Sequence, residues 1–276
     1  MSQTIVTKTN ASADLKSDIQ KILKPLGGIE NFIKPGDKVL LKPNLNTDDP
    51  FPGSSSSDFL EAVIELAKRA KPARVILGDS CTMSMRTEEV MKNMGVFELG
   101  KRMGVEVLNF DKGKYIKKKI AGKYLKSIRV PSILDEVDRL ILLPCLKTHR
   151  YARFTISLKL GVGFMKKIDR IFLHTRHFKE KIAEINLAYK PDLIILDGRK
   201  AFVSRGPDRG ELAEPNILMA SNDRIAIDVE GLKILKSYPA ENKLAGDVWQ
   251  LPQIKRAVEL NLGIKNEQEY SLMDVS

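Results

Sequence analysis

The sequence predicts an α/β protein with a mainly parallel sheet, helices on both faces and an inserted basic β-hairpin. Short apolar runs alternate with amphipathic segments along the chain, which is the pattern of alternating strands and helices. The apolar runs are nearly continuous, as expected of strands that are covered on both faces. Hydrophobic residues make up 43% of the 276 residues, enough to build a core. We expect a single domain over residues 1–276, with 111–130 as an insertion and a two-lobed arrangement as the alternative.

The first part of the chain supplies a regular series of elements. The segment KVLLK at 38–42 predicts a strand, and Asp58 predicts the N-cap of a helix that runs to residue 70. The following segments predict a strand at 73–79, helices at 87–94 and 96–103, and a strand at 105–110.

The regular alternation changes at residue 111. Residues 111–130 are rich in lysine and predict a β-hairpin that turns near Ala121 and Gly122. The most apolar run, RLILLPCL at 139–146, predicts one strand. The remaining segments predict helices starting at 155 and covering 178–188, strands at 192–198 and 216–221, and a helix capped by Asp223 that runs to about 235.

The composition limits the classes of function. No segment has the roughly 20 apolar residues of a membrane helix, and the N-terminal segment lacks the apolar core of a secretory signal. We therefore expect a cytoplasmic protein with no membrane partner. Two cysteines, Cys81 and Cys145, are too few for a disulfide framework, and an iron–sulfur cluster normally needs four. The net charge of +11 favours an anionic partner.

Polar side chains follow four of the predicted strands. Because ligands bind at the carboxyl ends of strands in open α/β sheets, we expect these side chains to meet in one cleft. Lys147, Lys159 and His149 are the predicted catalytic residues together with Asp197, and His149 would act as a general acid or base. The strand-end residues predicted to bind the ligand are Lys42, Asn44, Asp79, Ser80 and Thr148.

The segment from 147 to 181 concentrates positive charge. It contains ten Lys or Arg residues against Asp169 and Glu180, and like charges so close repel unless an anion lies among them. Gly161 and Gly163 would allow the backbone to approach a phosphate. All three histidines, His149, His174 and His177, also fall in this segment.

Several alternatives stay open at this point. His174 and His177 could be two ligands of a metal, although no third ligand is evident. Separately, Asp79 and Asp197 could orient partners in the cleft or hold a divalent metal. The lysine-rich hairpin, with Tyr115 and Tyr124 among its lysines, could bind nucleic acid, or its lysines could protect a strand edge. The two cysteines could form a redox pair or join a metal site.

Three segments together resemble the family called domain of unknown function 362. They are Lys42-Pro43-Asn44-Leu45, the run from Pro144 to His149 followed by Thr155, Lys159 and Gly161, and a block that runs from Asp197-Gly198 through Gly206-Pro207 and Gly210 to Ala220–Asp223 and Asp228. The resemblance covers roughly residues 36–235. It implies that Thr155, Gly206, Gly210, Asp223 and Asp228 also belong to the ligand-binding residues.

The resemblance brings no settled activity. Many family members carry a ferredoxin module, which would imply a separate redox partner here, because this chain has no such cysteines. Leu160 stands where the family pattern has an asparagine. The combination of His and Lys also looks loosely like the lactate-racemase family, which uses a nickel-pincer cofactor. The sequence thus predicts a basic cleft that binds or converts an anionic small molecule, without identifying a reaction.

Overall fold

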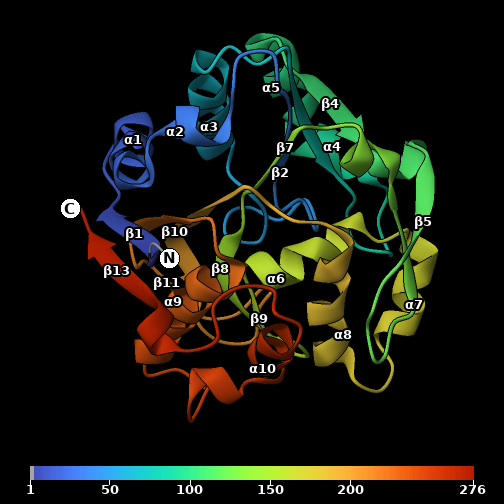
Figure 1. Cartoon of the computed structure of the whole chain (residues 1–276), viewed down its shortest axis with the longest axis vertical. Coiled ribbons are helices and arrows are strands. Elements are labelled where there is room, and N and C mark those ends of the chain that lie inside the picture. The colour runs from blue at the N-terminus through green and yellow to red at the C-terminus, as the bar shows by residue number, and fades with distance from the viewer. Residues whose placement is uncertain (1–2) are drawn as a thin grey trace.

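A mixed sheet that is mainly parallel runs through the middle of the molecule (Figure 1). The computed structural model describes residues 3–276. The main path of the 11-stranded sheet has the order β13-β1-β12-β10-β7-β2-β3-β4, and β8, β9 and β11 attach to it beside β10. A separate pair, β5-β6, forms the second sheet.

The strands are short, apart from β10. Their bounds are β1 Thr4–Asn10, β2 Lys38–Lys42, β3 Arg74–Asp79, β4 Glu106–Asn109, β5 Tyr115–Lys119, β6 Ser127–Pro131, β7 Arg139–Leu142, β8 Cys145–His149, β9 Arg153–Thr155, β10 Leu193–Phe202, β11 Leu212–Ala213, β12 Ile217–Ser221 and β13 Tyr270–Asp274. The α-helices are α1 Leu15–Leu23, α2 Ile29–Phe32, α3 Ser57–Arg69, α4 Thr87–Asn93, α5 Val96–Met103, α6 Ser157–Leu160, α7 Arg170–Leu173, α8 Phe178–Ile185, α9 Arg224–Ser237 and α10 Pro252–Glu259.

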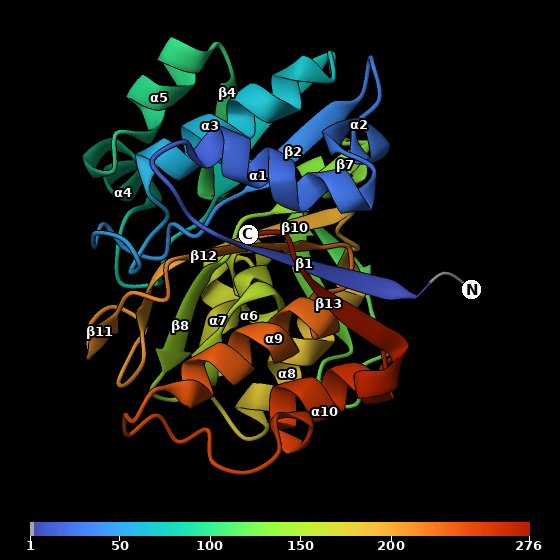
Figure 2. The ribbon, with the colours of Figure 1, turned by 90° about the vertical axis from the view of Figure 1, so that its left-hand side faces the viewer.

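The sheet separates two hydrophobic clusters. Successive residues of a strand point to opposite faces, so Leu40 belongs to one cluster and Leu41 to the other. Figure 2 shows α1, α3 and α5 on one side of the sheet and α8, α9 and α10 on the other. Helices therefore cover both faces, as the nearly continuous apolar strands predict.

Strand direction decides which loops can share a site. The strands β10, β7, β2, β3 and β4 run parallel, so their carboxyl ends lie at one edge. The strand β12 runs antiparallel to β10, and its last residue, Ser221, pairs with Ile194 near the start of β10. Residues that follow β12 therefore lie at the opposite edge.

The prediction of one strand over 139–146 is wrong. The chain forms β7 and then β8, with a break at Pro144, which lacks the N–H that a continuous strand needs. Beyond the break, β8 pairs with the second half of β10, where Phe202 lies opposite Lys147. Lys147, Thr148 and His149 therefore lie within a strand and not after one.

Other predicted boundaries need smaller corrections. The N-cap of α3 is Ser56, and Asp58 lies in the first turn of the helix. The strand predicted at 192–198 extends to Phe202, because β8 and β11 pair with its second half. The terminal strands β1 and β13 pair with each other and complete one end of the sheet, and neither was predicted.

The basic hairpin is confirmed. The strands β5 and β6 pair antiparallel from Tyr115↔Pro131 to Lys119↔Ser127, and the turn contains Gly122. Within residues 3–276 we find no helix with the length and apolar character needed to cross a membrane.

Candidate functional site

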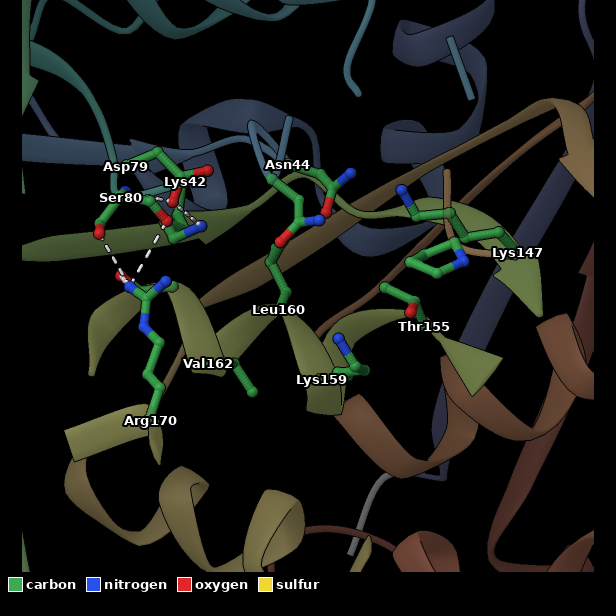
Figure 3. A pocket seen from close by; sticks show the side chains of 13 residues that line it. Lys42, Asn44, Asp79, Ser80, Lys147, Thr155, Lys159, Leu160, Val162 and Arg170 are labelled. Atoms are coloured by element: carbon green, nitrogen blue, oxygen red, sulfur yellow. Dashed lines mark hydrogen bonds and ion pairs between the residues drawn. The ribbon is translucent and has the colours of Figure 1, made fainter. Parts of the chain in front are cut away.

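A polar pocket lies at the carboxyl ends of β2 and β3 and reaches β8 and α6 (Figure 3). Its cavity volume is about 30 Å³. Seven of the predicted site residues line it: Lys42, Asn44, Asp79, Ser80, Lys147, Thr155 and Lys159. The remaining lining residues are Asn46, Leu160, Val162, Gly163, Arg170 and Pro207. The roles of these residues stay predictions, but their convergence is a property of the fold.

Lys42 and Asp79 form a buried ion pair at one end of the pocket. The Lys42 Nζ atom lies 2.7 Å from Asp79 Oδ1, and the two side chains are 1% and 3% exposed. Both residues end neighbouring parallel strands, which is why they meet. Asp79 also accepts hydrogen bonds from the backbone N–H groups of Leu45 (2.8 Å) and Ser80 (2.6 Å). Burial lowers the pKa of Lys42, and Asp79 opposes this shift.

Arg170 brings a second cation to the same end. Its guanidinium donates to Ser80 Oγ at 2.8 Å and to the carbonyl oxygens of Gly163 (3.1 Å) and Met165 (3.0 Å). Figure 3 shows Lys42, Asp79, Ser80 and Arg170 grouped on one side of the pocket. Burial lowers the pKa of Arg170, and the charge of Asp79 is the largest opposing influence.

Lys147 is buried at the other end without a carboxylate partner. Its ammonium donates to the carbonyl oxygens of Pro52 (3.0 Å) and Gly53, and Asn44 Nδ2 also donates to Gly53 at 3.1 Å. The loop after β2 is therefore held against β8 through its carbonyl groups. Burial lowers the pKa of Lys147.

Lys159 and Thr155 lie near Lys147. Thr155 is the antiparallel partner of Lys147, and Lys159 follows one turn later in α6 (Figure 3). The buried Thr155 Oγ1 has no hydrogen-bond partner within residues 3–276. Burial lowers the pKa of Lys159 to about 7, and the positive charges of Lys147 and Arg170 add to this effect.

The pocket therefore has an excess of positive charge. Lys42, Lys147, Lys159 and Arg170 line it, and Asp79 is its single carboxylate in the described part of the chain. A negatively charged group among them would relieve the repulsion that burial makes costly.

His149 does not line this pocket. Its Nδ1 atom accepts hydrogen bonds from the backbone N–H groups of Tyr151 and Ala152, both at 3.1 Å. Burial strongly lowers its pKa, and the charges of Lys159 and Lys147 lower it further. His149 instead faces a neighbouring pocket that Thr148 and Arg205 also line. A neutral imidazole whose acceptor nitrogen is occupied is a poor general base, so the geometry gives no support to the predicted role.

Asp197 also lies outside the pocket. Because β10 continues past it, the side chain lies in the middle of a strand, where it pairs with Arg199 at 2.8 Å. Arg199 also pairs with Asp58 at 2.7 Å and lowers the pKa of that carboxyl to about 2. Burial raises the pKa of Asp197, and Arg199 opposes this shift. The ion pairs of Arg199 with Asp197 and Asp58 therefore connect β10 to the first turn of α3.

The predicted Thr148, Gly206 and Gly210 shape a loop near the pocket. Thr148 Oγ1 donates to Phe202 O at 2.9 Å and accepts from the Gly206 N–H at 3.2 Å. A Cβ atom at Gly206 would lie 2.2 Å from Thr148 O, and one at Gly210 would lie 1.9 Å from Ser204 O. The two glycines allow close packing, while Pro207 between them lines the pocket.

The last two predicted residues stabilise helix starts. Asp223 caps α9 through the N–H groups of Ile225 and Ala226, both at 2.8 Å, at the opposite edge of the sheet. Asp228 lies beneath α6, where it accepts from Ser157 N at 2.8 Å and Leu158 N at 3.0 Å. Burial raises the pKa of Asp228 to about 7. Asp228 thus positions the helix that carries Lys159.

Sequence reasoning missed Arg170 as a pocket residue. Its charge was part of the basic segment, but nothing in the local pattern distinguishes a buried arginine from the exposed ones around it. Val162 and Gly163 also line the pocket and come directly after the helix that carries Lys159. The only sequence signal for this part of the pocket was the pair of glycines, Gly161 and Gly163, which would allow the backbone to approach a ligand.

The cysteines have separate surroundings. Both are free and buried. Cys81 Sγ accepts from Lys167 Nζ at 3.3 Å and from Thr87 Oγ1 at 3.2 Å. Cys145 Sγ lies 4.0 Å from Ser55 Oγ, and burial raises its pKa to about 11. Within residues 3–276, no three His, Cys, Asp or Glu side chains are close enough together to hold a metal ion.

The aromatic residues of the basic hairpin are half-buried and contact neighbouring side chains. Tyr124 stacks on His177 with ring centroids 4.1 Å apart, and Lys166 lies 5.8 Å from the ring centroid of Tyr115. Stacking of nucleic-acid bases on these rings would compete with these contacts. Nucleic-acid binding by the hairpin stays a prediction.

Comparison with known proteins gives a family and one close relative. The model described as "Domain of unknown function (DUF362)" matches residues 39–233, which include all three segments that carry the resemblance. The thylakoid-associated protein sll1697 of Synechocystis is 30% identical over 266 residues, covering 94% of this chain and 81% of that protein.

A solved structure shows a weaker similarity. The lactate racemase apoprotein from Thermoanaerobacterium thermosaccharolyticum has 13% sequence identity and a TM-score of 0.49. The match covers 82% of this chain and 56% of the racemase chain. This similarity is too low to inform the function.

Proposed function

The chain belongs to the DUF362 family, and we propose that its pocket binds a small molecule that carries a phosphate or carboxylate group. The observation that carries the proposal is the charge of the lining: four cations and one carboxylate within the described residues. Asp79 pairs with Lys42 and its charge also acts on Arg170, which leaves Lys147 and Lys159 without a carboxylate of their own inside the pocket.

The hydrogen bonds within the pocket support the same proposal. Burial of a polar group without a partner is costly, and Thr155 Oγ1 is such a group at the pocket wall. An anion oxygen would accept from the hydroxyl of Thr155 and from the ammonium of Lys159. Charge-assisted hydrogen bonds of this kind are about twice as strong as neutral ones.

Binding of inorganic phosphate and sulfate tests the proposal. A ligand that binds only the folded state raises the melting temperature as its concentration increases. We expect both anions to stabilise the wild-type protein beyond a chloride control of equal ionic strength. The variant Lys159→Met should lose most of this effect, whereas the variant of an exposed lysine, Lys255→Met, should keep it. Equal stabilisation of wild type and Lys159→Met would contradict the proposal.

The cytoplasmic location stays a prediction. Thylakoid association is a property of the cyanobacterial relative.

A further inference from the structure

Lys159 differs from the other three cations of the pocket. Lys42 pairs with Asp79, Lys147 donates to two carbonyl oxygens and Arg170 donates to Ser80 and to backbone carbonyls. Within residues 3–276, Lys159 has neither an ion pair nor a hydrogen bond from its ammonium group. Its amine therefore lines the pocket without being committed to the fold.

The surroundings of this amine suit a nucleophile. The Thr155 hydroxyl, which has no partner in the described chain, lies on the strand just before α6, and Lys147 lies opposite Thr155 in the sheet. Lys147 and Arg170 fix positive charges in the same pocket. Because Lys147 lies opposite Thr155, its charge would hold the carboxylate or phosphate of a ligand while the ligand's other end lies toward Lys159.

The protonation state of Lys159 agrees with this geometry. An amine attacks a carbonyl carbon only when its nitrogen is unprotonated, and burial beside other cations is an established way to keep a lysine neutral. Burial and the charges of Lys147 and Arg170 lower the pKa of Lys159 to about 7. This shift increases the fraction of Lys159 that is a free amine at neutral pH.

We propose that Lys159 condenses with the carbonyl group of a small anionic aldehyde or ketone, such as an oxo acid, to form an imine. This inference rests on the proposed anion binding and adds the chemical class of the ligand. The Nζ lone pair forms a bond to the carbonyl carbon, and the carbonyl oxygen takes a proton from the Thr155 hydroxyl, which solvent replenishes. The resulting carbinolamine loses water, nitrogen gives up its remaining proton to solvent, and a C=N bond replaces the C=O bond. No oxidant or reductant is needed.

Reductive trapping with glyoxylate tests the imine. Glyoxylate is an aldehyde that carries a carboxylate, and cyanoborohydride reduces its imine to a stable secondary amine. Peptide mapping by mass spectrometry then compares the modification of Lys159 with that of the exposed Lys255 in the same sample. We expect Lys159 to be modified at least tenfold faster at pH 7, and sulfate to slow its modification but not that of Lys255.

Variants separate the amine from its charge. Lys159→Arg keeps the positive charge without an amine that can condense, so it should bind sulfate but show no labelling in the pocket. Lys147→Arg should still be labelled at Lys159. If Lys159 is modified no faster than Lys255, the imine inference is wrong, even where sulfate stabilises the protein. If Lys159 is labelled selectively but sulfate neither stabilises the protein nor slows the labelling, the proposed anion binding is wrong instead. The carbonyl compound that forms the imine would then not need to be an anion.

Discussion

The buried carboxylate of Glu184 accepts a hydrogen bond from the backbone N–H of Lys123 at 2.7 Å, which anchors the basic hairpin to α8. The same carboxylate accepts from the N–H groups of Tyr124 (2.9 Å) and Leu125 (2.7 Å) and pairs with Arg256 at 2.7 Å. The two strands of the hairpin pair only with each other. One fully buried carboxylate therefore supplies the hydrogen-bond acceptor for three backbone N–H groups of the hairpin turn.

Replacement of Glu184 by glutamine should destabilise the hairpin. The amide would direct N–H groups at backbone N–H groups and leave Arg256 without its buried partner, at a cost of about 2–4 kcal/mol. Chemical denaturation would measure the loss, and hydrogen exchange should show faster exchange within residues 115–131. The control is Glu259→Gln, because Glu259 pairs with the same Arg256 but is half exposed. Equal effects of the two variants would rule out the anchoring role.

Asp79→Asn should be strongly destabilising. Loss of the charge leaves Lys42 buried without compensation, which costs about 3–5 kcal/mol for a buried pair. Combining it with Lys42→Met should recover much of the loss, since the uncompensated charge is then absent. The exposed pair Lys16–Glu65 offers the control, where Glu65→Gln should cost less than about 1 kcal/mol. Denaturation of the four variants provides the measurement, and additive effects of Asp79→Asn and Lys42→Met would contradict the pairing.

Sulfate affinity should fall as the pH rises above about 7. The pKa of Lys159 in the free protein is about 7, and a bound anion favours the protonated amine. Binding then takes up a proton above this pKa, so affinity drops by up to about tenfold per pH unit and is constant below pH 6. Titration calorimetry with sulfate, whose own charge is constant here, would show this. The Lys159→Arg variant should bind with little change between pH 6 and 9, and a parallel decline in that variant would exclude Lys159 as the cause.

Gly163→Ala should close the pocket near Lys42. A Cβ atom at this position would lie 2.7 Å from both Lys42 Nζ and Asp79 Oδ1, so the ion pair must shift. We expect at least a tenfold loss of sulfate affinity with a smaller change in stability. Gly113→Ala, at an ordinary φ of −85° and away from the pocket, should bind like wild type. Unchanged binding by Gly163→Ala would show that the anion does not approach this backbone.

Sequence patterns predicted the part of the site that depends on parallel strand ends. Lys42 and Asp79 end adjacent strands, so the topology alone brings them together. The prediction was wrong where pairing continued beyond an apolar run, as in β10, because the partners β8 and β12 lie far away in the sequence and determine the position of Asp197. Asp223, which the family resemblance placed among the ligand-binding residues, lies at the opposite edge because β12 runs antiparallel to β10, a direction that the residues of β12 do not reveal. The burial of Arg170 depends on tertiary packing that no local pattern encodes.

The division of the core by the sheet has a consequence for how the protein tolerates change. Leu40 and Leu41 are neighbours in the chain, yet their side chains belong to hydrophobic clusters on opposite faces. Substitutions in clusters that share few side-chain contacts have nearly additive effects on stability. The cluster beneath α1 and α3 can therefore accumulate sequence changes, or be redesigned for greater stability, largely independently of the cluster beneath α6, whose packing holds Lys159 in place.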